Sequence, residues 1–221
     1  MTAATSPTPE KNGPEPLSVG GLLYEGFELL DFFGPLEMFG LLGDRANITV
    51  VAEQAGPVRS SGGPSALAEA AMADTSGFDV LLIPGGIGNR RLMAEPAYVS
   101  EVRRLAEAAR LVFTVCTGSL LLGKTGLLDG RRATTNKRVF SQAACYAPDV
   151  NWIARARWVE DGKYVTSSGV SAGIDAALAG IAKLRGRETS LTIARRAEYV
   201  WQEDAACDPF AAAESPGVEP N

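Results

Sequence analysis

Short and almost uninterrupted apolar runs alternate in this sequence with longer segments of helical pattern, and this alternation limits the chain to few folds. Residues 79–84 read DVLLIP, and residues 111–115 read LVFTV. A strand that is apolar at nearly every position is typical of a parallel sheet covered on both faces. We therefore expect an α/β protein in which helices cover both faces of a mostly parallel sheet.

The remaining segments fit the same scheme. Two more strands are expected over residues 18–24 and 47–52, and helices over residues 31–42, 96–109, 117–122, 171–185 and 189–204. One stretch differs, because Asp161 and Gly162 stand between two strand-like runs within residues 155–166. An Asp-Gly pair in that position predicts a β-hairpin.

The length of 221 residues favours one domain with tails. We expect the folded domain over residues 17–211. Residues 1–16 are rich in Thr, Pro, Ala and Glu and lack the basic start and apolar run of a signal peptide, so a disordered tail is expected there. Residues 212–221 are expected to form a flexible acidic tail.

The absence of histidine is the compositional fact that most limits function. It excludes Ser-His-Asp triads, Cys-His nucleophiles and histidine-dependent zinc sites within this chain. The net charge of −5 comes without a basic stripe, and no apolar run is long enough to span a bilayer, so neither nucleic acid nor membrane is an expected partner. Three widely spaced cysteines indicate neither a disulfide framework nor a metal site, and they favour the cytoplasm.

Cys116 is the strongest candidate for a reactive group. It follows the apolar run 111–115 directly and precedes Thr117, Gly118 and a predicted helix. A nucleophile at such a strand-to-helix turn projects above the sheet, and the helix start lowers the pKa of a thiol. A buried and inert cysteine is the alternative reading. Cys145, expected in the core or half-buried, and Cys207, expected to be exposed, lack this context.

Asp31 is the best candidate for a proton donor and acceptor. It follows the first predicted strand and lies between apolar residues, which should raise the pKa of its carboxyl group. A carboxyl group of raised pKa can act as a general acid and base. From these residues alone, a helix N-cap is the first interpretation, because that position favours Asp. Glu25 and Glu28 compete for the catalytic role on the same loop.

Gly85, Gly86 and Ile87 follow the apolar run 79–84. Their backbone N–H groups are candidates for one side of an oxyanion-type hole, with the N–H of Thr117 as the other side. A tight turn is the simpler interpretation of two glycines. We expect ordinary core packing, rather than the lining of an apolar pocket, for four nearby apolar residues: Phe32, Phe33, Ile87 and Trp152.

Four segments together resemble the ThiJ/PfpI superfamily, most closely its isonitrile hydratase branch. They are LLDFFGPLEMFG at 29–40, DVLLIPGGIG at 79–88, VCTGSLLLGKTGLLDGRRATTN at 115–136 and TSSGVSAGIDAALA at 166–179. The resemblance implies a flavodoxin-like three-layer sandwich, like that of class I glutamine amidotransferases, and a homodimer. It also implies Cys116 as nucleophile, Asp31 as its acid/base partner and Thr117 beside the cysteine. The segment with Gly169 and Val170 would pass close to Asp31 and help to orient it.

Members of this branch add water to an isonitrile and form an N-substituted formamide. The resemblance therefore implies a small-molecule substrate and a cysteine thioimidate, with no metal and no organic cofactor. Asn136 stands where many similar sequences have His, which leaves the substrate open. Two alternatives remain: a glyoxalase or deglycase acting on reactive dicarbonyls, and a cysteine-based sensor of a ligand or of oxidation. Relatives also occur as sensor domains of AraC-type regulators, but too few residues follow Asp204 for a DNA-binding helix-turn-helix.

Overall fold

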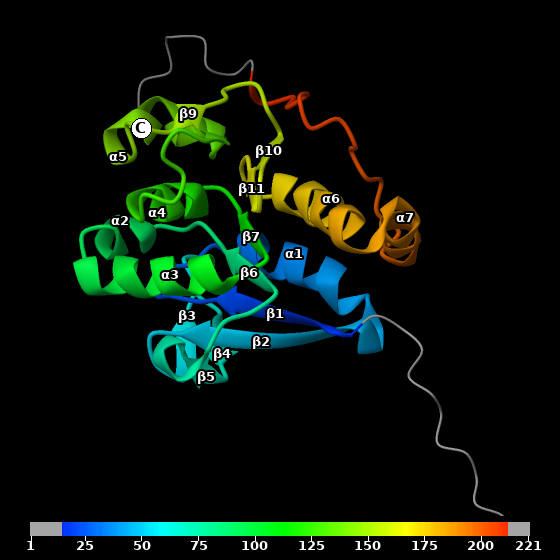
Figure 1. Ribbon diagram of the computed structural model, residues 1–221, viewed down its shortest axis with the longest axis horizontal. Helices are drawn as coiled ribbons and strands as arrows, with labels where there is room; N and C mark the ends of the chain where they lie inside the picture. The colour runs from blue at the N-terminus through cyan, green and yellow to red at the C-terminus, as the bar shows by residue number, and fades with distance from the viewer. Residues whose placement is uncertain (1–14, 212–221) are drawn as a thin grey trace, which may run out of the picture.

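A seven-stranded sheet forms the centre of the molecule (Figure 1). The structure is a computed structural model that describes residues 15–211. The strand order of the sheet is β10-β11-β7-β6-β1-β2-β5, and every neighbouring pair is parallel except β10 with β11. The bounds are β1 Leu17–Leu22, β2 Ala46–Ala52, β5 Ala70–Ala71, β6 Val80–Ile83, β7 Leu111–Thr114, β10 Trp158–Asp161 and β11 Tyr164–Ser167. The expected class and the mostly parallel sheet are confirmed. The expected C-terminal tail, residues 212–221, lies outside the described part, as does the expected N-terminal tail, residues 1–16, except for its last two residues.

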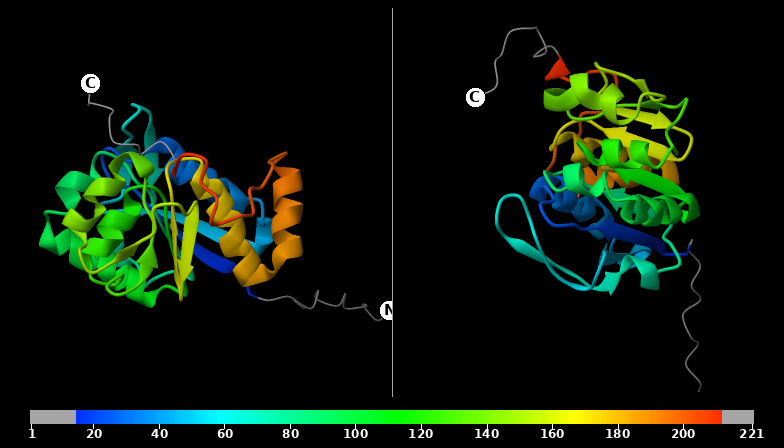
Figure 2. Two further views of the ribbon diagram at one scale, coloured as in Figure 1. Left: turned by 90° about the horizontal axis from the view of Figure 1, so that it is seen from above. Right: turned by 90° about the vertical axis from the view of Figure 1, so that its left-hand side faces the viewer.

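Helices cover both faces of the sheet, as Figure 2 shows from above. One layer contains α1 (Leu29–Gly40), α6 (Ala172–Arg185) and α7 (Arg187–Arg196). The other contains α3 (Pro96–Ala108) and α4 (Gly118–Lys124) with the short helices α2 (Asn89–Leu92) and α5 (Ala143–Tyr146). Smaller elements complete the fold: the antiparallel pair β3 (Gly56–Arg59) and β4 (Ser65–Ala68), the parallel pair β8 (Arg132–Ala133) and β9 (Asn151–Trp152), and 3-10 turns at Gly43–Arg45, Met72–Asp74 and Lys137–Gln142.

The apolar runs of the sequence occupy the middle of the sheet. All four residues of β6 and all four of β7 are buried, and the two strands pair in parallel from Val80 opposite Leu111 to Ile83 opposite Thr114. Parallel pairing places the carboxyl ends of β1, β6 and β7 at one edge of the sheet. The loops that follow these three strands therefore meet at that edge, which is where ligands gather in open α/β sheets.

The predicted hairpin is present, but the last predicted helix is shorter than expected. Strands β10 and β11 pair across a turn in which Gly162 has a φ of +61°. Helix α7 begins at Arg187 and ends at Arg196, not at residue 204. The chain leaves the helix because Glu198 takes a φ of +50°, and the segment after it then packs against α6. The β3–β4 hairpin had no counterpart in the prediction. Cys145 is exposed on the short helix α5, which corrects the expected core or half-buried position.

A buried ion pair fixes that last segment to the domain. The Asp175 carboxylate of α6 accepts hydrogen bonds from the Arg157 Nε at 2.7 Å, from the Tyr199 hydroxyl at 2.9 Å and from the backbone N–H of Gln202 at 2.9 Å. The side chains of Asp175 and Arg157 are 0% and 8% exposed. With every partner in place the pair is satisfied, but the loss of one partner would leave a buried charge alone.

We expect Asp175→Ala to lower the free energy of unfolding by about 3–5 kcal/mol, because Arg157 would stay buried without its carboxylate. The matched control is Glu160→Ala, which removes the exposed ion pair with Lys183 and should change stability by less than about 1 kcal/mol. Urea unfolding followed by circular dichroism measures both. Equal effects of the two substitutions would contradict this account of the C-terminal segment.

Candidate functional site

Cys116 occupies a strained turn between β7 and α4. Its φ is +57°, a conformation that residues other than glycine rarely adopt. The backbone around it is held from several sides: the Cys116 N–H donates to the Ser168 carbonyl at 3.0 Å, and the Cys116 carbonyl accepts from the hydroxyls of Thr135 at 2.9 Å and Ser119 at 3.0 Å. Strain held by so many contacts is typical of functional sites. The elbow predicted from the sequence is present.

Two glycines allow the backbone to close around this turn. A Cβ atom at Gly118 would lie 2.2 Å from the Ile83 carbonyl oxygen. A Cβ atom at Gly85 would lie 2.6 Å from the Asp31 Oδ2 and 2.8 Å from the Thr117 nitrogen. Contacts that short do not occur, so both positions require glycine for close approach.

Asp31 lies in the first turn of α1, and its side chain is fully buried. It does not cap the helix: the N-cap position belongs to Glu28, whose side chain makes no capping bond. The Asp31 Oδ2 accepts the N–H of Gly85 at 2.9 Å, whereas the Oδ1 has no hydrogen-bond partner among the described residues. Burial raises the pKa of Asp31 to about 7, although the Gly85 N–H and the neighbouring Cys116 side chain both act to lower it.

The Cys116 thiol is nearly buried, with 6% of the residue exposed. Its Sγ accepts a hydrogen bond from the Asn136 Nδ2 at 2.9 Å. Burial raises the pKa of Cys116 to about 12, and the charge of Asp31 also raises it, whereas the Asn136 amide and the Thr117 N–H act to lower it. This corrects the expectation of a thiol whose pKa is lowered by the helix start. The thiol is protonated near neutral pH, so a base must take its proton when the sulfur attacks.

The two glycines of the loop orient the site, and their N–H groups are not free, whereas the role expected for the Ile87 N–H stays a prediction. The Gly85 N–H is bound to Asp31, and the Gly86 N–H donates to the Thr117 Oγ1 at 3.1 Å. The Asn89 Nδ2 donates to the same hydroxyl at 3.1 Å. The oxyanion role expected for Gly85 and Gly86 is therefore corrected, because protein acceptors already use both N–H groups. Thr117 lies beside the cysteine, as expected.

The segment with Gly169 and Val170 lies beside Asn136 and the cysteine turn. A Cβ atom at Gly169 would lie 2.9 Å from the Asn136 Nδ2, and the preceding carbonyl of Ser168 accepts the Cys116 N–H. Val170 has a φ of +44°, a second strained position in the site. This segment contacts Cys116 and Asn136, and its expected place against Asp31 stays a prediction.

Asn136 is the site residue whose role the sequence did not reveal. It caps the 3-10 turn Lys137–Gln142, where its Oδ1 accepts the Arg138 N–H at 2.8 Å. Because that bond fixes the oxygen, the amide nitrogen is the end that faces the Cys116 sulfur. A capping residue straight after a short strand was the available signal. Tyr24 is a second neighbour: its hydroxyl donates to the Pro84 carbonyl at 2.6 Å, and burial raises its pKa well above the usual value.

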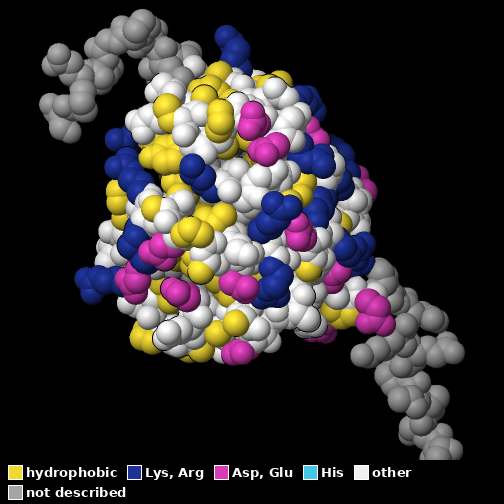
Figure 3. Space-filling view, turned by 60° about the vertical axis from the view of Figure 1, so that its left-hand side comes forward, with side chains coloured by type: hydrophobic (Ala, Val, Ile, Leu, Met, Phe, Trp, Pro, Cys, Tyr) yellow, Lys and Arg dark blue, Asp and Glu magenta, His cyan; other side chains and the backbone are white. Residues whose placement is uncertain are grey.

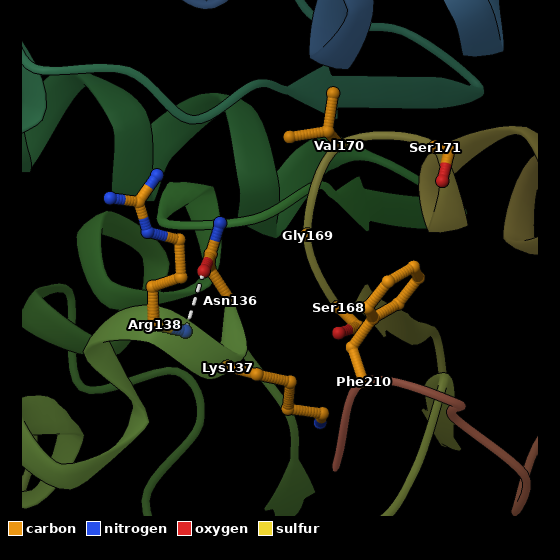
Figure 4. A pocket seen from close by; sticks show the side chains of 8 residues that line it. All are labelled: Asn136, Lys137, Arg138, Ser168, Gly169, Val170, Ser171 and Phe210. Carbon is orange, nitrogen blue, oxygen red and sulfur yellow. Dashed lines mark hydrogen bonds between the residues drawn. The ribbon is translucent and has the colours of Figure 1, made fainter. Parts of the chain in front are cut away.

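A pocket of about 350 Å³ adjoins the site (Figure 4), and Asn136 lines it. Val170 and Phe210 contribute apolar side chains, and Ser168 and Gly169 contribute one wall. None of the four apolar residues discussed above lines this pocket. Phe32 is buried in the core and Trp152 is half-buried against it, in line with core packing. Phe33 and Ile87 are instead 47% and 61% exposed, so core packing was the wrong expectation for these two.

A separate pocket of about 360 Å³ is lined by Tyr24, Glu53 and Arg91 among others, and it does not include Cys116 or Asp31. Within residues 15–211, no three acidic or cysteine side chains gather into a possible metal site, and no helix is long and apolar enough to cross a membrane. On the face shown in Figure 3, Lys and Arg side chains are interspersed with Asp and Glu. The acid and thiol at the strand ends are thus the chemical centre that the described residues offer.

Comparison with known proteins identifies similar chains. The sequence model of the DJ-1/PfpI family matches residues 18–183. The isonitrile hydratase of Pseudomonas putida is 35% identical over 184 residues, which cover 83% of this chain and 78% of that protein. The transcriptional regulator CdhR of Pseudomonas aeruginosa is 28% identical, over 79% of this chain and 53% of the regulator. A solved ThiJ/PfpI family protein from Pseudomonas syringae has a TM-score of 0.78 at 29% identity, and the match covers 89% of this chain and 82% of that structure.

We expect two substitutions to shift the ionisation of Cys116 in opposite directions. Asp31→Asn removes a negative charge and should lower the pKa of the thiol, whereas Asn136→Ala removes a donor to the sulfur and should raise it. In a Cys145→Ser/Cys207→Ser background, the rate of alkylation by iodoacetamide at fixed alkaline pH reports the thiolate. The alkylation rate should rise about tenfold for each unit by which the pKa of the thiol falls, and fall about tenfold for each unit by which it rises. Alkylation no faster in Asp31→Asn than in the parent protein would contradict the coupling of the two groups.

Proposed function

We propose that this chain, which belongs to the DJ-1/PfpI family, is an isonitrile hydratase that adds water to R–N≡C and releases an N-substituted formamide. The family expected from the sequence motifs is confirmed by the match. The observation that carries the proposal is the buried pair of Cys116 and Asp31. A carboxyl group with a pKa of about 7 can both accept and donate a proton near neutral pH, next to a thiol that needs a base.

The first step forms a carbon–sulfur bond. The Asp31 carboxylate takes the thiol proton while the Cys116 sulfur attacks the terminal carbon of the isonitrile. One π pair of the carbon–nitrogen bond becomes a lone pair on the nitrogen, and the carbon keeps the lone pair that it already carried. The carbon then takes the proton from the Asp31 carboxyl group, which gives the thioimidate R–N=CH–S–Cys and restores the carboxylate. The Asn136 amide supports the negative charge that develops on the sulfur, because it donates to the Sγ.

The second step replaces sulfur by oxygen. The Asp31 carboxylate accepts a proton from water as the hydroxyl adds to the thioimidate carbon, and it passes that proton to the nitrogen. The carbon–sulfur bond then breaks, the hydroxyl proton returns to the departing sulfur through Asp31, and R–NH–CHO leaves. One water is consumed, and the enzyme regains its thiol proton and its carboxylate. No group outside the chain is required for this balance.

Similarity and chemistry both favour this proposal over the alternatives. The Pseudomonas putida isonitrile hydratase is similar over most of both chains. Oxidation sensing needs a thiolate that is formed easily and lies exposed, whereas Cys116 is nearly buried and its pKa is raised. Hydration needs only a thiolate formed during attack, since the base lies next to the thiol. The alternative of dicarbonyl chemistry is tested by comparing the turnover of isonitriles with that of a dicarbonyl.

We expect the purified protein to convert cyclohexyl isocyanide into the formamide, with a rate that rises with pH through about 7 because Asp31 must be ionised to take the thiol proton. Cys116→Ala should abolish turnover, and Asp31→Asn should lower kcat by about 10²–10⁴-fold. Formamide is measured by chromatography. The amide oxygen in Asp31→Asn would still accept the Gly85 N–H, so the loop geometry should survive.

Cys145→Ser is the matched control, because this thiol is exposed on α5 and does not line the pocket at the site. It should retain full activity. Full activity of Cys116→Ala or Asp31→Asn would overturn the mechanism. Conversion of methylglyoxal to lactate, with isonitriles untouched, would overturn the function in favour of dicarbonyl chemistry.

We propose further that the chain acts as a homodimer in the cytoplasm. Three free cysteines support a reducing compartment. An exposed apolar patch supports a second copy: Leu30 and Phe33 on α1 are 41% and 47% exposed, and Ile87 is 61% exposed. These residues are connected through Phe27, whose ring lies 6.4 Å from that of Phe33 and whose backbone bridges to Gly86.

We expect sedimentation equilibrium to give a dimer mass for the parent protein and a monomer mass for Phe33→Asp, because a charge at this position would be buried in the interface. Val200→Asp is the control: this residue is 90% exposed and is not one of the three residues of the patch, so the substitution should leave the mass unchanged. A monomer mass for the parent protein would refute the proposed dimer.

A further inference from the structure

The C-terminal segment after α7 returns to the site and forms part of its pocket. It is not helical at its start, yet the backbone holds it to the loop before β10. The Arg157 N–H donates to the Ala205 carbonyl at 2.8 Å, and the Asp208 N–H donates to the Arg155 carbonyl at 3.2 Å. These bonds fix the chain just before Phe210, and Phe210 lines the same pocket as Asn136.

Asp208 anchors this segment from within. Its side chain is fully buried, with the Lys137 Nζ at 3.8 Å and the Arg157 Nη1 at 3.9 Å. A buried carboxylate is costly unless cations and hydrogen-bond donors surround it. Its Oδ1 also accepts the N–H of Phe210 at 3.0 Å, and its carbonyl accepts the N–H of Ala211 at 3.0 Å. The buried charge thus fixes the turn from which Phe210 projects.

Phe210 is the unusual member of this turn. Its side chain is 61% exposed although it is large and apolar, and it borders the pocket together with Val170 (Figure 4). In the close view its ring lies on the opposite side of the pocket from Arg138. An anchored turn that holds an aromatic ring at the edge of a pocket provides apolar contact area for a ligand.

Asn136 connects this pocket with the reacting atom. Its amide nitrogen contacts the Cys116 sulfur, and the same residue lines the pocket. A substrate whose terminal carbon meets the sulfur therefore has the pocket beside it for its substituent. A volume of about 350 Å³ lies at the lower end of the range for small-molecule sites and suits a single ring or short chain.

We propose, on the basis of the hydratase function above, that Phe210 determines substrate specificity by packing against a bulky apolar substituent of the isonitrile. Asp208 is the positioning residue for this contact, acting through the turn. The substrate class is an isonitrile with a cyclic or branched hydrocarbon group, and small isonitriles gain nothing from this wall. The C-terminal segment thereby becomes part of the substrate pocket.

The test compares cyclohexyl isocyanide with methyl isocyanide. Phe210→Ala should lower kcat/KM for the cyclohexyl substrate by about tenfold or more and leave the methyl substrate nearly unchanged, because only the larger group reaches the ring. Phe210→Leu, which keeps an apolar wall, should recover part of the loss. Val200→Ala is the control for an exposed apolar residue away from the pocket and should change neither value.

A second measurement does not depend on isonitrile turnover. In the Cys145→Ser/Cys207→Ser background, Cys116 is alkylated with N-cyclohexylmaleimide and with N-methylmaleimide. Phe210→Ala should lower the ratio of the cyclohexyl rate to the methyl rate. Asp208→Asn should lower it in the same direction, with the methyl rate and the circular dichroism spectrum unchanged.

The outcomes separate this inference from the proposed function. If neither isonitrile is hydrated but the maleimide ratio falls in Phe210→Ala, the apolar wall is upheld and the hydratase function is refuted. If both isonitriles are hydrated, and Phe210→Ala changes neither the cyclohexyl-to-methyl ratio of kcat/KM nor the ratio of the maleimide rates, the function is upheld and the inference is overturned. An unchanged maleimide ratio in a protein without hydratase activity overturns both.

Discussion

The buried contact between the Cys116 thiol and the Asp31 carboxyl group is the interaction on which the site depends. Each group is removed from water, and this burial raises both pKa values. The charge of Asp31 raises the pKa of Cys116 further, whereas the Cys116 side chain acts to lower the pKa of Asp31. Between about pH 7 and about pH 12 the pair therefore holds a single proton. A site in this state can move a proton from sulfur to oxygen and back without a histidine, which the chain does not contain.

The buried acid and the strained turns of this site cost folding free energy. The pKa of Asp31 is raised in the folded chain, so the folded state binds this proton more tightly than the unfolded state does. Its favourable contribution is present below the pKa of the unfolded chain and is lost as the pH rises through about 7. The strained backbone at Cys116 and Val170 also costs folding free energy. The buried strands β6 and β7 and their hydrogen-bonded loops offset it.

Buried charges connect the scaffold with the pocket. Arg157 pairs with Asp175 of α6 on one side and lies near Asp208 on the other, while Lys137 lies near Asp208 and directly follows Asn136. The charged residues that hold the C-terminal segment to the domain thus lie next to Asn136, the residue that donates to the Cys116 sulfur. This arrangement explains why buried charges, which are weak stabilisers in general, are placed beside the site.

The sequence by itself determined the fold class and the placement of Cys116 and Asp31 at the end of the sheet, because both follow from local pattern. Continuous apolar runs require a covered parallel sheet, and a cysteine or aspartate that follows such a strand must lie at its carboxyl end. Only the tertiary structure decided what these groups experience. The burial that raises the pKa of Cys116, the amide of Asn136 on its sulfur, the use of the Gly85 and Gly86 donors inside the site, and the return of Phe210 to the pocket all arise between segments far apart in the chain. Their energies depend on distance and on exclusion of water, and neither quantity is encoded in the spacing of residues along a sequence.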